Sequence, residues 1–176
     1  MYLQDSGPQG IVSIETENYD VTVYQGGHSW LEVYDSGYSG TAAMEASPNV
    51  GDNINTGYVS SSPRLDFQVY FVKTGTHYLW IRGIGASSYD DSCHVGLDGG
   101  AVGTSDRITG FGNNWIWTDR TIDGPVARIF ISSAGLHTVN VWMREDGVVL
   151  DKLVLTTDST YVPTGTGPNE SPRELN

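Results

Sequence analysis

The clearest alternation of apolar and polar residues in this chain lies at residues 64–71. Leu65, Phe67, Val69 and Phe71 occupy every second position, and more polar residues stand between them. Because successive side chains of a β-strand point to opposite faces, this pattern predicts a strand with one buried and one solvated face. We expect the apolar face to contribute to the core of the protein.

Shorter apolar runs, separated by turn residues, recur along the whole chain. Segments of strand-forming composition are found at residues 11–19, 41–46, 64–71, 78–82, 93–97, 115–118, 125–131, 135–144 and 148–156. The turn at residues 73–76 predicts that the strands on its two sides form a hairpin. No stretch has the periodicity of an amphipathic helix. With 22 glycines among 176 residues, the pattern predicts one all-β domain, either a sandwich or a barrel.

Acidic side chains stand in the first and the last of these strands. Glu15 and Glu17 lie two positions apart and are expected to project from one face. Asp151 interrupts an apolar run, where an ionised carboxylate is costly unless it is paired or bound to a metal. If the two strands pair antiparallel, the three carboxylates meet, and their hard oxygen atoms suit Ca²⁺. Alternatively, the glutamates are solvated and Asp151 pairs with Lys152 or an arginine.

A turn-rich loop that contains Asn113 and Asn114 leads into a short strand with two tryptophans, Trp115 and Trp117. In a regular strand both indoles point to the same face. We expect Trp117 to lie in the core and Trp115, beside the loop, to be exposed. An exposed indole can stack on the C–H face of a sugar ring while the neighbouring amides hydrogen-bond its hydroxyls. The alternative is that both tryptophans are core residues, since tryptophan is well buried on average.

Charged residues are concentrated in the predicted loops near this strand. The group comprises Arg82, Asp90, Asp91, His94, Arg144, Glu145 and Asp146. Charged donors and acceptors of this kind suit sugar hydroxyls, and Asp91, Arg144 and Asp146 are the candidates for ligand binding. Ordinary solvation of surface turns is the alternative.

Catalytic motifs do not stand out in the sequence. The nucleophile elbow, the zinc-protease helix motif and the phosphate-binding loop are absent, and the four histidines are scattered. A glycosidase needs two placed carboxylates, but none of the acidic residues lies in a recognisable motif. Because no set of groups can be given catalytic roles, we expect no enzymatic activity.

The chain is strongly acidic, with 21 Asp and Glu against 9 Lys and Arg, a formal net charge of −12 and no basic cluster. This charge disfavours nucleic acids, anionic membranes and polyanionic glycans as partners, and it suits a cation such as Ca²⁺. Cys93 is the one cysteine, so no intrachain disulfide is possible. No stretch is apolar enough to span a membrane, and the first residues lack a signal-peptide pattern. The lack of a disulfide does not exclude secretion, and we expect a module excised from a longer chain.

Several segments together resemble a known family. The segments are IETENYD at residues 14–20, HVGLDGG at 94–100, NNWIW at 113–117, AGLHTVNVWMREDG at 134–147 and GVVLDKLVLTTD at 147–158. In order and spacing they resemble the carbohydrate-binding modules of families 6 and 35 and their malectin-like relatives. The resemblance implies a jelly-roll β-sandwich of two antiparallel sheets, non-catalytic and appended to a secreted polysaccharide-degrading enzyme.

The resemblance also implies roles for individual residues. In this family an I-E-x-E segment and an aspartate in a late strand hold a structural calcium ion, and Glu15, Glu17 and Asp151 match these positions. A tryptophan of a W-x-W segment often stacks on the sugar, which Trp115 matches, and the second tryptophan is usually a core residue, which fits Trp117.

The chain departs from the family at Val149, where the family often has a ligand-binding asparagine. Arg144, Glu145, Asp146 or Asn114 can substitute for it, or the sugar site lies elsewhere.

These observations predict a calcium-containing polysaccharide-binding domain at residues 11–157. Residues 1–10 are a predicted lead-in, and residues 158–176, rich in Pro, Gly and Thr, a predicted linker or tail. We expect a monomer, tethered within a larger enzyme, whose ligand is bound by Trp115, Asn113, Asn114, Asp91, Arg144 and Asp146. The alternatives are a structural or protein-interaction sandwich of a large surface protein and a small glycoside hydrolase or lyase.

Overall fold

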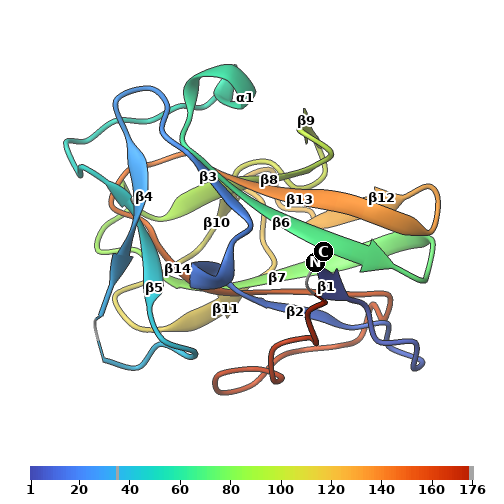
Figure 1. The fold of residues 1–176 in the computed structure, drawn as a ribbon. Helices are drawn as coiled ribbons and strands as arrows, with labels where there is room; N and C mark the ends of the chain where they lie inside the picture. The colour runs from blue at the N-terminus through green and yellow to red at the C-terminus, as the bar shows by residue number, and fades with distance from the viewer. Residues whose placement is uncertain (35, 175–176) are drawn as a thin grey trace.

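The computed structural model describes residues 1–34 and 36–174, and within them two β-sheets pack face to face (Figure 1). Sheet A consists of β1 (Tyr2–Leu3), β3 (Val21–Val23), β6 (Arg64–Phe71), β8 (Ser92–Leu97), β9 (Gly100–Ala101), β10 (Ile108–Thr109) and β13 (Gly135–Met143). Sheet B consists of β2 (Val12–Glu15), β4 (Ser29–Val33), β5 (Ala43–Ser47), β7 (Gly75–Ile84), β11 (Ile116–Thr118), β12 (Arg128–Ile131) and β14 (Val149–Thr156). The described helical elements are the 3-10 turn η1 (Thr16–Asn18) and the single turn α1 (Tyr58–Ser61). The predicted all-β sandwich is confirmed.

Neither described helix has the length or the apolar character needed to cross a membrane.

The strand pairing differs in one respect from the expected two antiparallel sheets. β1 runs parallel to β6, with Tyr2 beside Val69, so sheet A is mixed. The other pairs of named strands are antiparallel. Tyr2 is wholly buried and belongs to the hydrophobic core. Burial of its ring therefore holds this short parallel strand in place.

The connection between β6 and β7 crosses from one sheet to the other. β6 pairs with β13 in sheet A, whereas β7 pairs with β14 in sheet B. The hairpin predicted from the turn at residues 73–76 is therefore wrong. Phe67 on β6 and Leu79 and Ile81 on β7 are buried in the same core cluster. Burying both apolar faces in one core places the two strands in opposite layers, which a turn signal alone does not reveal.

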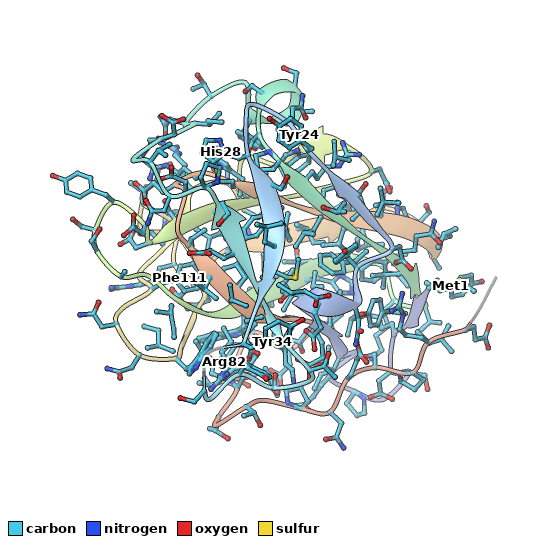
Figure 2. All side chains as sticks on the ribbon, turned by 60° about the vertical axis from the view of Figure 1, so that its left-hand side comes forward. Met1, Tyr24, His28, Tyr34, Arg82 and Phe111 are labelled. Atoms are coloured by element: carbon cyan, nitrogen blue, oxygen red, sulfur yellow. The ribbon has the colours of Figure 1, made fainter. Side chains whose placement is uncertain are left out.

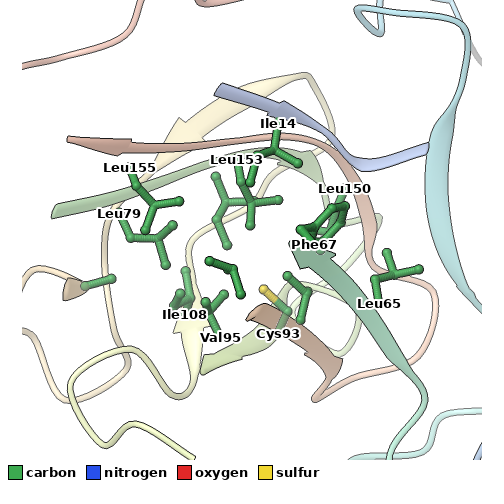
Figure 3. Close-up of a cluster of buried hydrophobic side chains, with 14 of the residues drawn as sticks. Ile14, Leu65, Phe67, Leu79, Cys93, Val95, Ile108, Leu150, Leu153 and Leu155 are labelled. Carbon is green, nitrogen blue, oxygen red and sulfur yellow. The ribbon is translucent and has the colours of Figure 1, made fainter. Parts of the chain in front are cut away.

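Apolar side chains from both sheets fill the space between the layers (Figure 3). Leu65 and Phe67 come from sheet A, Leu79 and Leu153 come from sheet B, and all four are wholly buried. Burial of a side chain of this size contributes about 1.5–3 kcal/mol relative to its exposure. The alternation at residues 64–71 thus correctly predicts the buried face of β6.

β14 lies in the middle of sheet B and is buried along its whole length. It pairs antiparallel with β2, as expected for the strands that carry Asp151 and Glu15, and Lys152 lies opposite Glu15. On its other side, the pairing with β7 is irregular between Leu150 and Lys152. A bulge of this kind interrupts the strict alternation of side chains. Asp151 and Lys152 can consequently lie on the same face of the sheet although they are consecutive.

Residues 157–174, here called the strap, run back over the outer face of sheet B and end beside the N-terminus (Figure 1). The indole N–H of Trp117 donates to the carbonyl of Gly165 in the strap at 3.0 Å. At the end of the strap, the ammonium group of Met1 donates to the carbonyl of Glu174 at 2.8 Å. The described part of the predicted tail is therefore attached to the sandwich.

His94 on β8 is buried beneath the α1 turn. Its ring stacks on Tyr58 with 3.7 Å between the ring centroids. Its Nδ1 accepts a hydrogen bond from the backbone N–H of Arg107 at 3.0 Å, so Nε2 carries the proton and donates to the carbonyl of Ile54, also at 3.0 Å. Burial lowers the pKa of His94 to about 4. A neutral imidazole thus joins three segments of sheet A and its loops.

Removal of the strap is expected to lower the melting temperature by about 10 °C. Truncation after Asp158 deletes several partly buried hydrogen bonds of about 1 kcal/mol each, and 1 kcal/mol corresponds to about 2–4 °C in a domain of this size. Thermal unfolding followed by circular dichroism measures the shift. Val162→Ala, at an exposed strap residue, is the control and should melt with the intact protein. A truncated domain that melts within 1 °C of the intact one would show that the strap adds no stability.

Acid is expected to destabilise the protein through His94. Its pKa of about 4 in the folded state lies below the usual value of about 6.5, so this stabilisation is complete above pH 6.5 and is lost as the pH falls toward 4. Urea unfolding should show a loss of about 2 kcal/mol from this residue between pH 7 and pH 5. The His94→Gln variant is expected to be less stable at pH 7 but to lack the loss of unfolding free energy that His94 causes between pH 7 and pH 5. The His137→Gln variant, changed at a partly exposed histidine, should still show that loss. Equal losses in both variants would contradict the assignment.

Candidate functional site

Trp115 lies where the asparagine-containing loop meets β11. Its indole N–H donates to the backbone carbonyl of Ser36 at 3.0 Å. Gly37 approaches the indole so closely that a Cβ atom there would stand 2.8 Å from Cδ1 of the ring. The guanidinium carbon of Arg82 lies 5.0 Å from the ring centroid, which is a cation–π contact. Trp115 is therefore held in one orientation while part of its side chain remains exposed.

Trp117 is not the core residue that was expected. It is partly exposed, and it packs against the strap, where a Cβ atom on Gly167 would stand 2.5 Å from Cζ2 of its indole. In the pairing of β11 with β7 it lies opposite Arg82, whose neighbour Ile81 points into the core. The expected alternation therefore places both indoles on the outer face of sheet B, where the strap covers the second one.

The three predicted metal ligands, Glu15, Glu17 and Asp151, are buried around one loop and are here called the carboxylate cluster. The hydroxyl of Ser39 donates to Oε2 of Glu15 at 2.7 Å and lies 3.0 Å from Oδ2 of Asp151. The backbone N–H of Ser39 donates to Oδ1 of Asp151 at 2.7 Å. The backbone N–H of Thr41 donates to Oε1 of Glu17 at 2.6 Å. The structure thus brings together acids from the beginning and the end of the chain.

Two cationic side chains pair with this cluster. Nζ of Lys152 lies 2.7 Å from Oε1 of Glu15, and Nη1 of Arg82 lies 2.6 Å from Oδ2 of Asp151. Burial raises the pKa of Glu15, while hydrogen bonds from Lys152 and Ser39 act in the opposite direction. Each of these two carboxylates therefore faces an opposite charge within the protein.

These ion pairs bear on the predicted calcium ion. Ca²⁺ needs oxygen ligands that are free to surround it, but Glu15 and Asp151 are already in contact with an ammonium and a guanidinium group. Among the described residues, no group of three or more acidic, histidine or cysteine side chains is arranged to hold a metal ion. In this arrangement the three carboxylates do not offer a set of free oxygen ligands to a divalent ion. Calcium binding at this cluster therefore stays a prediction that these contacts do not support.

Asp146 is wholly buried and binds a neighbouring loop of the protein. Its Oδ2 accepts hydrogen bonds from the backbone N–H groups of Val50 at 2.6 Å and Gly51 at 3.0 Å, and lies 3.3 Å from Nε2 of His28. Burial favours the neutral acid, but the hydrogen bonds from Val50, Asp52 and His28 outweigh it and hold the pKa of Asp146 below its ordinary value. Its oxygen atoms therefore shape the loop beside the predicted site.

Asp91 and Arg144 lie in a second charged group together with Glu145. Nη1 of Arg144 donates to Oε1 of Glu145 at 2.7 Å, and Oε2 of Glu145 accepts from the backbone N–H of Asp91 at 3.1 Å. Oδ1 of Asp91 accepts from the hydroxyl of Thr109 at 3.1 Å. Burial raises the pKa of Asp91, and the nearby charge of Glu145 adds to the effect. Asp91 and Arg144 remain partly exposed, whereas Glu145 is buried.

Asn113 and Asn114 are exposed on the loop that runs between these groups. Phe111 at the base of this loop is buried in the core and anchors it. Figure 2 shows Phe111 between Arg82 on one side and His28 on the other. The predicted ligand-binding residues are therefore spread along one edge of the sandwich, with Trp115 at the Arg82 end and Asp146 at the His28 end.

Sequence reasoning missed several residues that shape this edge. Ser36 and Gly37 contact Trp115, and their place in a Gly- and Ser-rich segment indicated only a loop. Arg82 and His94, grouped with the charged loop residues as candidates for sugar binding, are buried within β7 and β8. For Arg82 the alternation of the apolar run at residues 78–82 indicated a strand position, but nothing in it indicated the partner Asp151.

Solved structures with the same fold include several carbohydrate-binding modules. The GH26-CBM35 β-(1,4)-mannanase of Podospora anserina aligns with a TM-score of 0.59 and 19% identity over 87% of this chain and 29% of that chain. A family 35 carbohydrate-binding module from Clostridium thermocellum aligns with a TM-score of 0.56 and 14% identity over 82% of this chain and 96% of that one. The C-terminal family 6 module of LamC, a laminarinase from Zobellia galactanivorans, aligns with a TM-score of 0.53 and 14% identity over 84% of this chain and 99% of that one. The resemblance to families 6 and 35 is confirmed at the level of the fold.

The chain is also similar in sequence to known proteins. An uncharacterized protein, P23, from Formosa agariphila is 37% identical over 114 residues, which are 60% of this chain. The chain spans only 28% of the length of that relative. The sequence profile of the glycosyl hydrolase family 115 C-terminal domain matches residues 7–170. Because this match covers most of the sequence, the chain belongs to the family of glycosyl hydrolase family 115 C-terminal domains.

Proposed function

We propose that this domain is a non-catalytic polysaccharide-binding module of a larger, secreted carbohydrate-active enzyme. The observation that carries the proposal is the partly exposed indole of Trp115, fixed at the edge of the sandwich by Ser36 and Arg82. The carbohydrate-binding modules with the same fold support it, as does membership in a family named for the C-terminal domain of a glycosyl hydrolase.

The surroundings of Trp115 favour stacking on a sugar ring. Its N–H is already bonded to Ser36, so the indole does not lose rotational freedom when a ligand binds, which reduces the entropic cost of binding. The guanidinium of Arg82 lies over the ring and steadies it from within the protein. A sugar would contact the exposed part of the indole with its C–H groups.

Polar contacts to the sugar are proposed to come from the loops next to Trp115. Asn113 and Asn114 are exposed beside it, and their amides provide both donors and acceptors. Asp91 and Arg144 are partly exposed farther along the same edge and suit a longer, extended chain. Asp146 contributes indirectly, since it is buried and holds the loop of Val50.

Binding at such a site is expected to be weak. One aromatic stack and a few hydrogen bonds that compete with water correspond to micromolar to millimolar dissociation constants, or roughly −8 to −4 kcal/mol. Attachment to an enzyme makes this affinity useful, because the tether holds the catalytic domain at a high effective concentration near the polysaccharide. The net charge of −12 favours neutral polysaccharides over polyanionic ones.

Trp115→Ala is expected to abolish retention of the domain on affinity gels that contain the polysaccharide it binds. The matched control is Trp117→Ala, the same change on the same strand but under the strap, which should keep retention even if its melting temperature falls. A panel of neutral polysaccharides identifies the gel to use, and far-UV circular dichroism confirms that both variants are folded. Full retention by Trp115→Ala together with loss by Trp117→Ala would move the sugar site from Trp115 to Trp117 beside the strap. Absence of binding by the intact domain across the panel would contradict the function.

A further inference from the structure

We propose that Lys152 and Arg82 take the place of a divalent metal ion at the carboxylate cluster, so that this domain folds without calcium. The proposal concerns the stability of the sandwich and is independent of what the domain binds. It rests on the charges and contacts within the cluster of Glu15, Glu17 and Asp151.

The charges of the cluster nearly balance without a metal ion. Three ionised carboxylates carry −3, and the ammonium of Lys152 and the guanidinium of Arg82 together supply +2, which equals the charge of one Ca²⁺. Both cationic side chains are nearly buried, with 3% and 8% of their side-chain surface exposed. A divalent ion added to this arrangement would lie close to two positive charges in a poorly solvated place, where repulsion is strong.

The carboxylate oxygen atoms of Glu15 and Asp151 are already occupied. Oε1 of Glu15 contacts Lys152, and its Oε2 accepts from the hydroxyl of Ser39. Oδ2 of Asp151 contacts Arg82, and its Oδ1 accepts from the backbone N–H of Ser39. All four oxygens of these two carboxylates therefore have donors from the protein itself. A metal ion would have to displace them.

Glu17 accounts for the remaining negative charge. Its Oε1 accepts from the backbone N–H groups of Thr41 at 2.6 Å and Ala42 at 3.4 Å, and these dipoles stabilise the charge. Its Oε2 is buried and has no hydrogen-bond partner among the described residues. Burial raises the pKa of Glu17. The cluster thus contains one buried carboxylate oxygen without a hydrogen-bond partner in the described part of the chain, and this oxygen could bind a metal ion once a neighbouring cationic side chain is removed.

The bulge in β14 explains how a lysine reaches this place. In a regular strand, Asp151 and Lys152 would point to opposite faces. The irregular pairing between Leu150 and Lys152 lets both side chains enter the cluster. Nζ of Lys152 also donates to the carbonyl of Pro168 in the strap at 3.0 Å. One ammonium group therefore joins β14, β2 and the strap, as a bound ion would join them.

The experiment has two parts, of which the first uses the unaltered protein. Thermal unfolding in EDTA and in about 1 mM CaCl₂ should give melting temperatures within about 1 °C of each other. Calorimetric titration with CaCl₂ should show no stoichiometric binding. One bound calcium per chain, or a melting temperature that EDTA lowers by several degrees, would overturn the proposal.

The second part replaces the lysine. Lys152→Met leaves Glu15 buried and unpaired, so we expect a melting temperature about 10 °C lower, of which CaCl₂ restores at least half. The control is Lys73→Met, the same change at a lysine whose ammonium donates to the carbonyl of Pro8 at the surface. Its melting temperature should stay close to that of the intact protein and should not rise with CaCl₂. If Lys152→Met does not fold alone, refolding it with and without CaCl₂ gives the same comparison. A Lys152→Met variant that calcium neither stabilises nor refolds would show that the lysine does not stand in for a metal.

Discussion

The burial of three carboxylates between the first and last parts of the chain is the constraint that shapes this domain. A buried charge is tolerated only when it is paired and hydrogen-bonded. Here the pairing draws in Lys152 from β14, Arg82 from β7 and the backbone of residues 39–42. The loop over the edge of sheet B is therefore positioned by electrostatics in the interior, together with the Ser39 hydroxyl and the close approach of Gly40 to Glu17.

This constraint extends to the proposed sugar site. The guanidinium group of Arg82 donates hydrogen bonds to Asp151 and to the carbonyl of Gly37, and it also lies over the ring of Trp115. The orientation of the indole is thus coupled to the centre of the sandwich through a single side chain. An exposed aromatic residue on a mobile loop would lack this support and would bind more weakly, since its ordering would oppose binding.

The sequence predicted features that follow from local periodicity or from strong buried-charge costs. Three features could be predicted in this way: the apolar face of β6, the pairing of the strands that carry Glu15 and Asp151, and the placement of Trp115 and Trp117 on one face. The β6–β7 hairpin was wrong because a turn looks the same whether it joins neighbours in a sheet or crosses between layers. Trp117 was wrongly predicted to be a core residue. It is instead covered by the strap, whose sequence has no periodic apolar pattern that would predict this contact. The alternative that Asp151 pairs with an arginine is confirmed. That this arginine is Arg82, and that Lys152 pairs with Glu15, depend on a bulge and on tertiary contacts that no local signal encodes.

The closeness of the two chain ends has a mechanical consequence. Met1 bonds Glu174, Leu3 bonds Pro172, and Tyr2 forms a bridge with Arg173, so the ends lie antiparallel to each other. Tension that pulled the ends apart would break these bonds one after another, as in unzipping, and not all at once in shear. The strap would peel away at low force and uncover Trp117 while the core of the sandwich stayed intact.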